Sequence, residues 1–188
     1  NSNLKRSGTK LSLSQEQVDD FIRCSEDPVY FIEKYVKIIT LDKGFVNVSL
    51  YDFQKQAIES IKDNRRVILK TGRQLGKTTM VVGFIVWYIM FNEDKTVAIL
   101  ANKAATAREI LGRVKIAYES LPTWLQQGIK VWNKGDIELE NKCRVMATST
   151  ASSAIRGYSI NCVTKKTKIC VLDDKTEDIY YTEISNII

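Results

Sequence analysis

Apolar positions follow helical spacing in the N-terminal third of the chain. Residues 14–38 place their apolar side chains on one helical face, and Pro28 divides this segment into a helix that starts at Ser14 and a second, short helix. The segment "VSLYDFQKQAIESIKDN" (48–64) predicts a third amphipathic helix. Residues 1–13 are predicted to be a polar tail, with neither an initiator Met nor a signal-peptide pattern, so the native start is expected to be missing or processed.

Two compact apolar runs further along the chain predict buried strands. They are "RRVILK" (65–70) and "KTVAILANK" (95–103), and each is followed by a segment with the features of a helix. This alternation predicts an α/β fold with a mostly parallel sheet and flanking helices. In "GDIELENKCRVMATS", two short strands are predicted around a turn at Asn141 and Lys142.

The composition adds limits. The chain has 188 residues, of which 44% are apolar and 27% charged, enough for one globular domain or one domain with a fragment. Its net charge of +6 does not by itself identify a polyanionic partner, because many solvated surfaces are as basic. The longest apolar block, "MVVGFIVWYIMF", is shorter than the roughly 20 residues that a membrane-spanning helix needs, so no membrane partner is expected. Four cysteines without a CxxC pair indicate neither a zinc site nor a disulfide framework, and fit a reducing cytosol.

The segment "TGRQLGKTT" (71–79) has the features of a phosphate-binding loop. It lies between a predicted strand and a predicted helix, the arrangement in which backbone N–H groups and a helix N-terminus surround phosphates. Gly76 would allow close approach of the backbone, Lys77 would neutralise phosphate charge, and the Thr78 hydroxyl would bind Mg²⁺. The loop departs from the common pattern because Thr71 stands at the first glycine position, and a chance Gly-Lys-Thr-Thr at a helix start is the alternative.

This loop, with Arg and Gln ahead of Leu-Gly-Lys-Thr-Thr, resembles the deviant Walker A motif of tailed-phage terminase large subunits, the motors that package DNA. The resemblance runs from about Asp20 to Asn161 and includes "LPTWLQQGIKVWNKGDIELEN" and "TSTASSAIRGYSIN". It implies a P-loop NTPase fold, incomplete here, with ATP and Mg as cofactors. The nucleotide-binding residues that it implies are Phe53, Gln54, Gly72, Arg73, Gln74, Gly76, Lys77, Thr78 and Thr79.

Three of the implied roles go beyond the common phosphate-loop pattern. Phe53 and Gln54 match a segment that contacts the adenine, and a Gln amide can both donate to and accept from its edge. Arg73 matches a loop arginine that acts on the γ-phosphate, and with Lys77 it is an expected catalytic residue. Arg156 is an expected coupling residue. A surface Gln on an amphipathic helix and an exposed loop Arg are the structural alternatives.

The resemblance to terminases stops after Asn161. There the family continues into an apolar strand that ends in Asp-Glu, whereas this chain continues with "CVTKKTKICVLDDKTEDIYYTEISNII". If "ICVLDD" were the Walker B strand, with Asp173 and Asp174 as its acids, the chain would need both an inserted "CVTKKTK" and an Asp in place of Glu.

Residues 162–188 resemble instead the N-terminal block of an intein. Cys162 starts the block, two alternating strands flank a charged turn, and together they predict a β-hairpin segment of a Hint-like splicing fold. The Cys162 thiol would attack the carbonyl of Asn161 and form a thioester. The chain contains no histidine, which inteins also require, and 27 residues are too few for a core. A second polypeptide is therefore expected to supply the rest, although a fragmentary gene would look the same.

The prediction is a chain of two parts, 14–161 from a terminase ATPase and 162–188 from a split intein. Joined by trans-splicing at Cys162 to a complementary C-terminal intein–terminase polypeptide, it would hydrolyse ATP to move double-stranded DNA into capsids, in the cytoplasm of a phage-infected bacterium. Portal and small terminase subunit are further implied partners. Alone it would be a poor ATP hydrolase. The alternatives are a complete small P-loop ATPase or helicase-like translocase using Asp173 and Asp174, and a nucleotide-binding assembly module that never hydrolyses.

Overall fold

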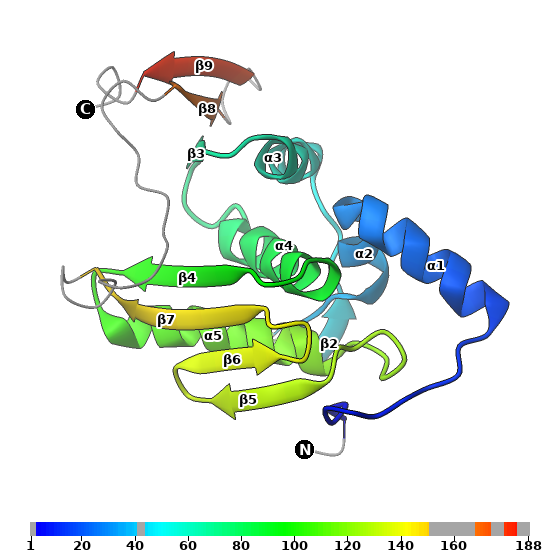
Figure 1. The fold of residues 1–188 in the computed structure, drawn as a ribbon. Coiled ribbons are helices and arrows are strands. Elements are labelled where there is room, and N and C mark those ends of the chain that lie inside the picture. The colour runs from blue at the N-terminus through cyan, green and yellow to red at the C-terminus, as the bar shows by residue number, and fades with distance from the viewer. Residues whose placement is uncertain (1–2, 41–43, 151–167, 174–178, 184–188) are drawn as a thin grey trace.

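The computed structural model describes residues 3–40, 44–150, 168–173 and 179–183, whose helices and strands are shown in Figure 1. In chain order they are α1 (Gln15–Glu26), α2 (Pro28–Tyr35), β1 (Lys37–Thr40), β2 (Gly44–Asn47), α3 (Asp52–Asp63), β3 (Val67–Lys70), α4 (Lys77–Phe91), β4 (Thr96–Ala101), α5 (Ala104–Glu119), β5 (Ile129–Asn133), β6 (Asp136–Leu139), β7 (Arg144–Ser149), β8 (Lys168–Asp173) and β9 (Ile179–Glu183).

The boundaries of the first two helices follow the capping residues in the sequence. Ser14 caps α1 in a capping box, with its side chain accepting a hydrogen bond from the Gln17 N–H at 3.3 Å and its own N–H donating to the Gln17 side chain at 3.0 Å. Asp27 caps α2 by accepting from the Tyr30 N–H at 2.8 Å, with Pro28 at the first helical position. The predicted division of this segment at Pro28 is confirmed.

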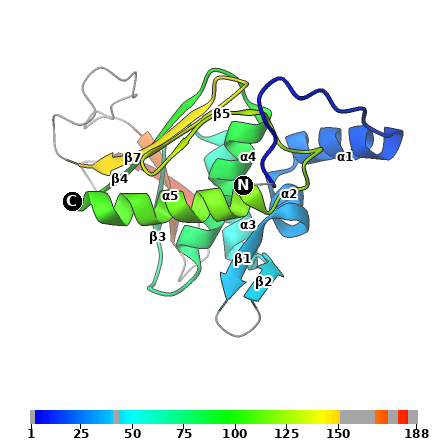
Figure 2. The same ribbon diagram turned by 90° about the horizontal axis from the view of Figure 1, so that it is seen from below.

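The strands form mixed sheets. The larger sheet has the order β4-β7-β6-β5, in which β4 and β7 are parallel and the other pairs antiparallel. Figure 2 shows α5 lying across one face of this sheet, where it contacts β4 and β7. Among the described strands, the expected mostly parallel arrangement is not met, because the short connections between β5, β6 and β7 allow only antiparallel pairing. The predicted turn after β6 is confirmed, and Lys142 takes a φ of 63° there.

A second sheet of three strands has the order β3-β8-β9. Here β8 is parallel to β3 and antiparallel to β9. The sequence analysis did not predict the small antiparallel pair β1 and β2, nor β5, because these segments have too few alternating apolar positions to stand out.

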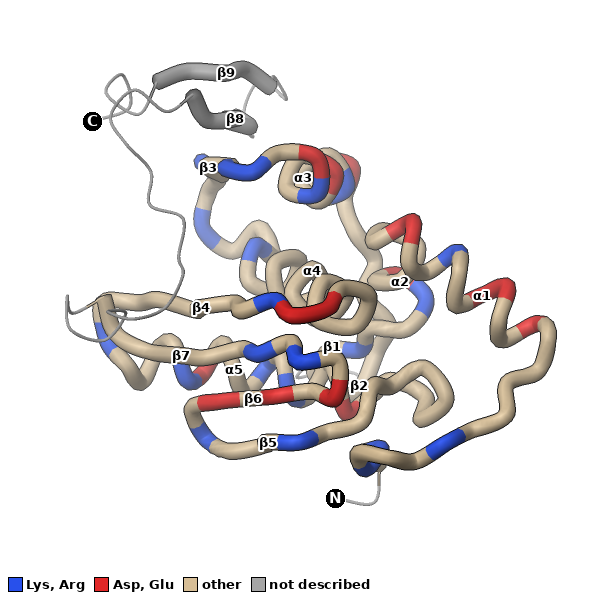
Figure 3. Tube along the Cα trace, in the orientation of Figure 1, with Lys and Arg blue, Asp and Glu red and all other residues tan. Residues whose placement is uncertain are grey.

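Helix α4 is the centre of the core. It has no charged residue after Lys77, as the tan tube in Figure 3 shows, and it contacts α2, α3 and α5. The Trp87 indole N–H donates to the Cys24 carbonyl at 2.8 Å, which ties α4 to α1. In the part of the chain that the structure describes, no helix is long and apolar enough to span a bilayer, and α4, at 15 residues, is too short.

The strands on the two sides of α4 are less buried than their sequences predict. Val67, Ile68 and Leu69 of β3 are only half-buried. In β4, Ile99 is buried, whereas Val97 is half-buried and Leu100 is exposed. The apolar runs predicted that both strands would be fully buried. In the described structure, part of the surface of β3 and β4 is left uncovered.

Candidate nucleotide-binding site

Residues 71–76 form a loop that connects the end of β3 to the start of α4. Gly76 is the residue that precedes the helix, and it takes a left-handed conformation with a φ of 70°. A Cβ at this position would lie 2.6 Å from the Gln54 side-chain nitrogen, so the loop needs glycine both for its conformation and for its packing. Gln74 also has a positive φ, of 64°. Strand, tight loop and helix therefore follow one another in the order predicted.

The helix N-terminus at this loop is suited to an anion. No side chain caps α4 and its first turn has no acidic residue. Its first N–H groups have no intrahelical partner, and the helix dipole makes this end positive. Lys77 adds a full charge in the first helical position, and its ammonium donates to the carbonyls of Thr71 (3.1 Å) and Gly72. The Lys77 ammonium thus lies within the loop.

The Thr71 hydroxyl is a buried group of the loop that is left unpaired in the described structure. Its oxygen is buried and has no hydrogen-bond partner there. An unpaired buried hydroxyl costs about 1–3 kcal/mol, so a ligand oxygen in reach would stabilise the loop. Together with the uncapped helix and Lys77, this fits the phosphates of a nucleotide.

Gln54 holds the loop from the side. It is 4% exposed, and its side-chain amide donates to the Leu75 carbonyl at 2.9 Å while accepting from the Tyr51 N–H at 3.0 Å. The prediction for Gln54 was a contact with adenine, with a surface position as the alternative. The residue is buried, so the surface alternative is wrong, whereas the adenine contact stays a prediction. Its amide connects the N-terminus of α3 to the loop of residues 71–76.

Two aromatic rings flank Gln54 in sequence. Tyr51 and Phe53 stack with their centroids 5.9 Å apart and their planes 9° from parallel. Tyr51 is 67% exposed, which is high for so large an apolar surface. The sequence analysis named Phe53 and missed Tyr51, although an aromatic residue two positions earlier in "LYDFQ" was the available signal.

The remaining predicted loop residues occupy different positions. Gly72, Arg73 and Gln74 are exposed, and Arg73 forms no ion pair within the described residues. Thr78 and Thr79 are half-buried in the first turn of α4. Thr79 lines a separate cavity of about 300 Å³ with residues of β1 and α5. Within the described residues, no group of three acidic, Cys or His side chains could hold a metal. The role of Thr78 as a Mg²⁺ ligand stays a prediction.

Several predicted residues lie outside the described residues, namely Arg156, Asn161, Cys162 and Asp174. Asp173 is the last residue of β8, whose backbone is described. In the parallel pairing of β3 and β8, Asp173 is opposite Lys70, the last residue before the phosphate loop.

Comparison with known proteins identifies the family. Residues 68–169, more than half of the chain, match the family model described as the terminase large subunit, T4likevirus-type, N-terminal. The chain belongs to this terminase family. The matched segment includes the whole phosphate loop and α4, and it extends eight residues beyond Asn161.

A solved structure agrees with the fold of the terminase chain. A crystal structure of the HK97 bacteriophage large terminase is similar, with a TM-score of 0.55 and 18% sequence identity. The similarity covers 74% of this chain and 29% of the HK97 protein, so the terminase chain spans less than a third of that relative.

Replacing Gln54 should weaken phosphate binding through the loop. Gln54→Ala removes two hydrogen bonds, each contributing about 0.5–1.5 kcal/mol, and frees Leu75 and Gly76 to move. We expect the affinity for ATP to fall about fivefold, and the affinity for inorganic tripolyphosphate to fall equally, measured by calorimetry. Gln56→Ala is the matched control, since Gln56 is exposed on the same helix. A loss confined to ATP would instead indicate direct adenine contact.

Proposed function

We propose that residues 14–161 are the N-terminal part of the ATPase of a phage DNA-packaging motor. The observation that carries this proposal is the phosphate loop, with Gly76 left-handed and Lys77 at an uncapped helix N-terminus, inside the segment that matches the terminase family. Bound ATP with Mg²⁺ would supply the phosphoanhydride whose hydrolysis powers translocation of double-stranded DNA.

The loop residues have separate roles in this proposal. The N–H groups at the start of α4 and the Lys77 ammonium would hold the phosphates, and the Thr78 hydroxyl would be a ligand to Mg²⁺. Arg73, exposed on the loop, is available to neutralise charge on the γ-phosphate. Tyr51, which is exposed, and Phe53, which is half-buried and stacked on it, offer an apolar face for the base. Arg156 is proposed to couple hydrolysis to movement.

Residues 162–188 are proposed to be the N-terminal piece of a split intein. The Cys162 sulfur attacks the Asn161 carbonyl carbon, a C–S bond forms as the C–N peptide bond breaks, and the thiol proton moves to the released amine. The thioester then passes to a nucleophile on a complementary polypeptide, which carries the rest of the ATPase. The antiparallel pairing of β8 and β9 is in keeping with the expected hairpin. The motor function also implies the portal and the small terminase subunit as partners and the host cytoplasm as the location.

A second candidate is a complete small ATPase that uses Asp173 and Asp174 as its acids. The parallel pairing of β8 with β3 favours it, since Asp173 then lies at the sheet edge from which the phosphate loop starts. The match of residues 162–169 to the family also favours it. The inserted lysines, the Asp in place of Glu and the antiparallel β9 favour the intein.

ATP turnover by the purified chain separates the two candidates. The motor-fragment proposal expects nucleotide binding with negligible turnover by the chain alone, and turnover once a complementary polypeptide is ligated to it. Turnover by the chain alone, abolished by Asp173→Ala, would support the complete ATPase and contradict the intein assignment.

A further inference from the structure

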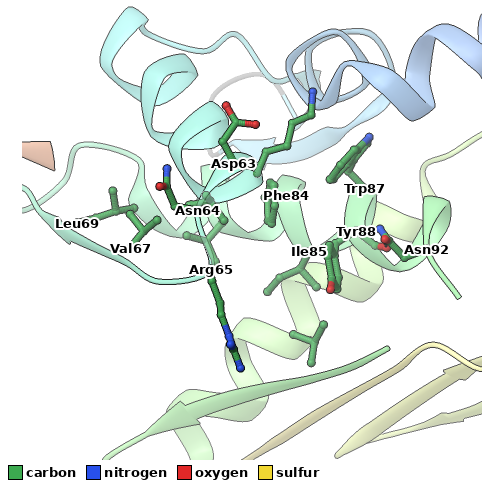
Figure 4. A pocket seen from close by; sticks show the side chains of 14 residues that line it. Asp63, Asn64, Arg65, Val67, Leu69, Phe84, Ile85, Trp87, Tyr88 and Asn92 are labelled. Atoms are coloured by element: carbon green, nitrogen blue, oxygen red, sulfur yellow. The ribbon is translucent and has the colours of Figure 1, made fainter. Parts of the chain in front are cut away.

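A cavity of about 830 Å³ separates β3 from β4. Figure 4 shows Val67 and Leu69 of β3 on one side and Phe84, Ile85 and Tyr88 of α4 at its base. Val97 of β4 also lines it. The side chains from the two strands and α4 are largely apolar. The end of α3 and the segment after it also line the cavity (Figure 4), with Ile61, Lys62, Asp63, Asn64 and Arg65. We refer to this cavity as the β3–β4 groove.

The two strands that border the groove each have one edge without a partner among the described strands. β3 is the end strand of the sheet β3-β8-β9, and β4 is the end strand of the sheet β4-β7-β6-β5. A strand, a helix and a strand in succession normally join parallel strands of one sheet, with the helix packed on its face. Here β3, α4 and β4 form such a unit, but its strands belong to separate sheets, as Figure 1 shows.

The strands and the helix at the groove are less buried than their sequences predict. Continuous apolar runs such as "VIL" and "TVAILA" are typical of strands covered on both faces. Val67, Leu69 and Val97 are only half-buried, and all three line the groove. Helix α4 is apolar all round, the pattern of a helix buried on every side, yet Phe84 and Tyr88 are left half-exposed there.

We propose that the β3–β4 groove is the docking site for one or more apolar β-strands of the complementary polypeptide that carries the rest of the ATPase. Strands inserted there would pair with the edges of β3 and β4 and cover α4, so that the two sheets become one. The solved terminase has more than two thirds of its length outside the matching part, which is ample chain to supply such strands. This proposal rests on the proposed function, because the complementary polypeptide is itself part of that function.

Strand insertion also bears on the order of events. Exposed strand edges and an apolar groove would bind the partner before any covalent bond forms. Backbone pairing along two edges provides register, and apolar side chains provide affinity. The groove would therefore raise the effective concentration of the partner during splicing.

The test measures binding of the two polypeptides without splicing. The full chain with Cys162→Ala is mixed with the complementary ATPase polypeptide from the same genome, made without its intein part. We expect binding, with amide exchange slowed in residues 67–70 and 96–101. Placing charges in the groove with the double change Leu69→Lys and Val97→Lys should weaken binding at least about tenfold. Phe45→Lys is the matched control, since Phe45 is 60% exposed on β2, away from the groove.

Other outcomes would overturn the inference. These are absence of binding, binding with protection elsewhere, protection by a second copy of this chain, and protection that disappears when residues 162–188 are deleted. If circular dichroism shows that the double lysine variant does not fold, amide exchange measured on the chain without these two substitutions still decides the question. Nucleotide binding of the ligated product tests the proposed function separately, so the two can fail independently.

Discussion

Cys162→Ala is expected to abolish formation of the ligated product when the chain is co-expressed with its complementary polypeptide. The thiol is the group that converts the Asn161–Cys162 amide into a thioester, and alanine has no nucleophile to replace it. Enzymes and self-processing proteins lose many orders of magnitude in rate without their nucleophile, so product should fall below detection, at least about 100-fold. Intact mass spectrometry would measure the product, which lacks residues 162–188.

Cys170→Ala is the matched control for this experiment. Cys170 lies inside β8, opposite Val67 in the parallel pairing, and has no proposed chemistry, so ligation should continue. Incubation with a small thiol adds a second measurement, because a thioester at Asn161 would release residues 162–188 from the chain only when Cys162 is present. Ligation that survives Cys162→Ala, or that is lost only with Cys170→Ala, would contradict the intein assignment.

Local signals in the sequence predicted most of the helices and the loop between β3 and α4. Ser14 and Asp27 are caps and Pro28 is a start signal, and these act within a few residues of chain, so α1 and α2 begin where expected. The order strand, loop, helix around Lys77 has the same local origin. Residues 37–47 and β5 were missed because short strands depend on pairing with distant segments, which periodicity does not reveal.

The position of Gln54 shows where sequence reasoning ends at the site. The residue type predicted hydrogen bonds to adenine, which stay a prediction, because an amide can bond equally well to a base or to a backbone. Only the placement of α3 against the loop directs it to Leu75. The same holds for β3 and β4, since their composition predicted full burial and the described structure leaves them half-covered at the groove. This mismatch is the observation on which the proposed docking of a partner at the groove rests.

Lys77→Ala is expected to remove most nucleotide binding by the chain and all ATP hydrolysis by the ligated product. The ammonium lies in the loop at the N-terminus of α4, where its charge adds to the dipole of the helix. A hydrogen bond to a charged group contributes about 1.5–3 kcal/mol, and about 1.4 kcal/mol corresponds to a tenfold change, so the affinity for ATP should fall about 10- to 100-fold. Calorimetry with ATP and with tripolyphosphate would measure it, and both should weaken together.

Lys130→Ala controls for the loss of one positive charge, since Lys130 is exposed on β5 in the other sheet and its replacement should leave the affinity unchanged. Folding is not expected to change with Lys77→Ala, because the Lys77 ammonium bonds only to loop carbonyls in the described structure and alanine is a good helix former at the start of α4. Equal affinities for Lys77→Ala and the unchanged chain would place the nucleotide elsewhere, and the terminase resemblance of the loop would then describe its shape and not its ligand.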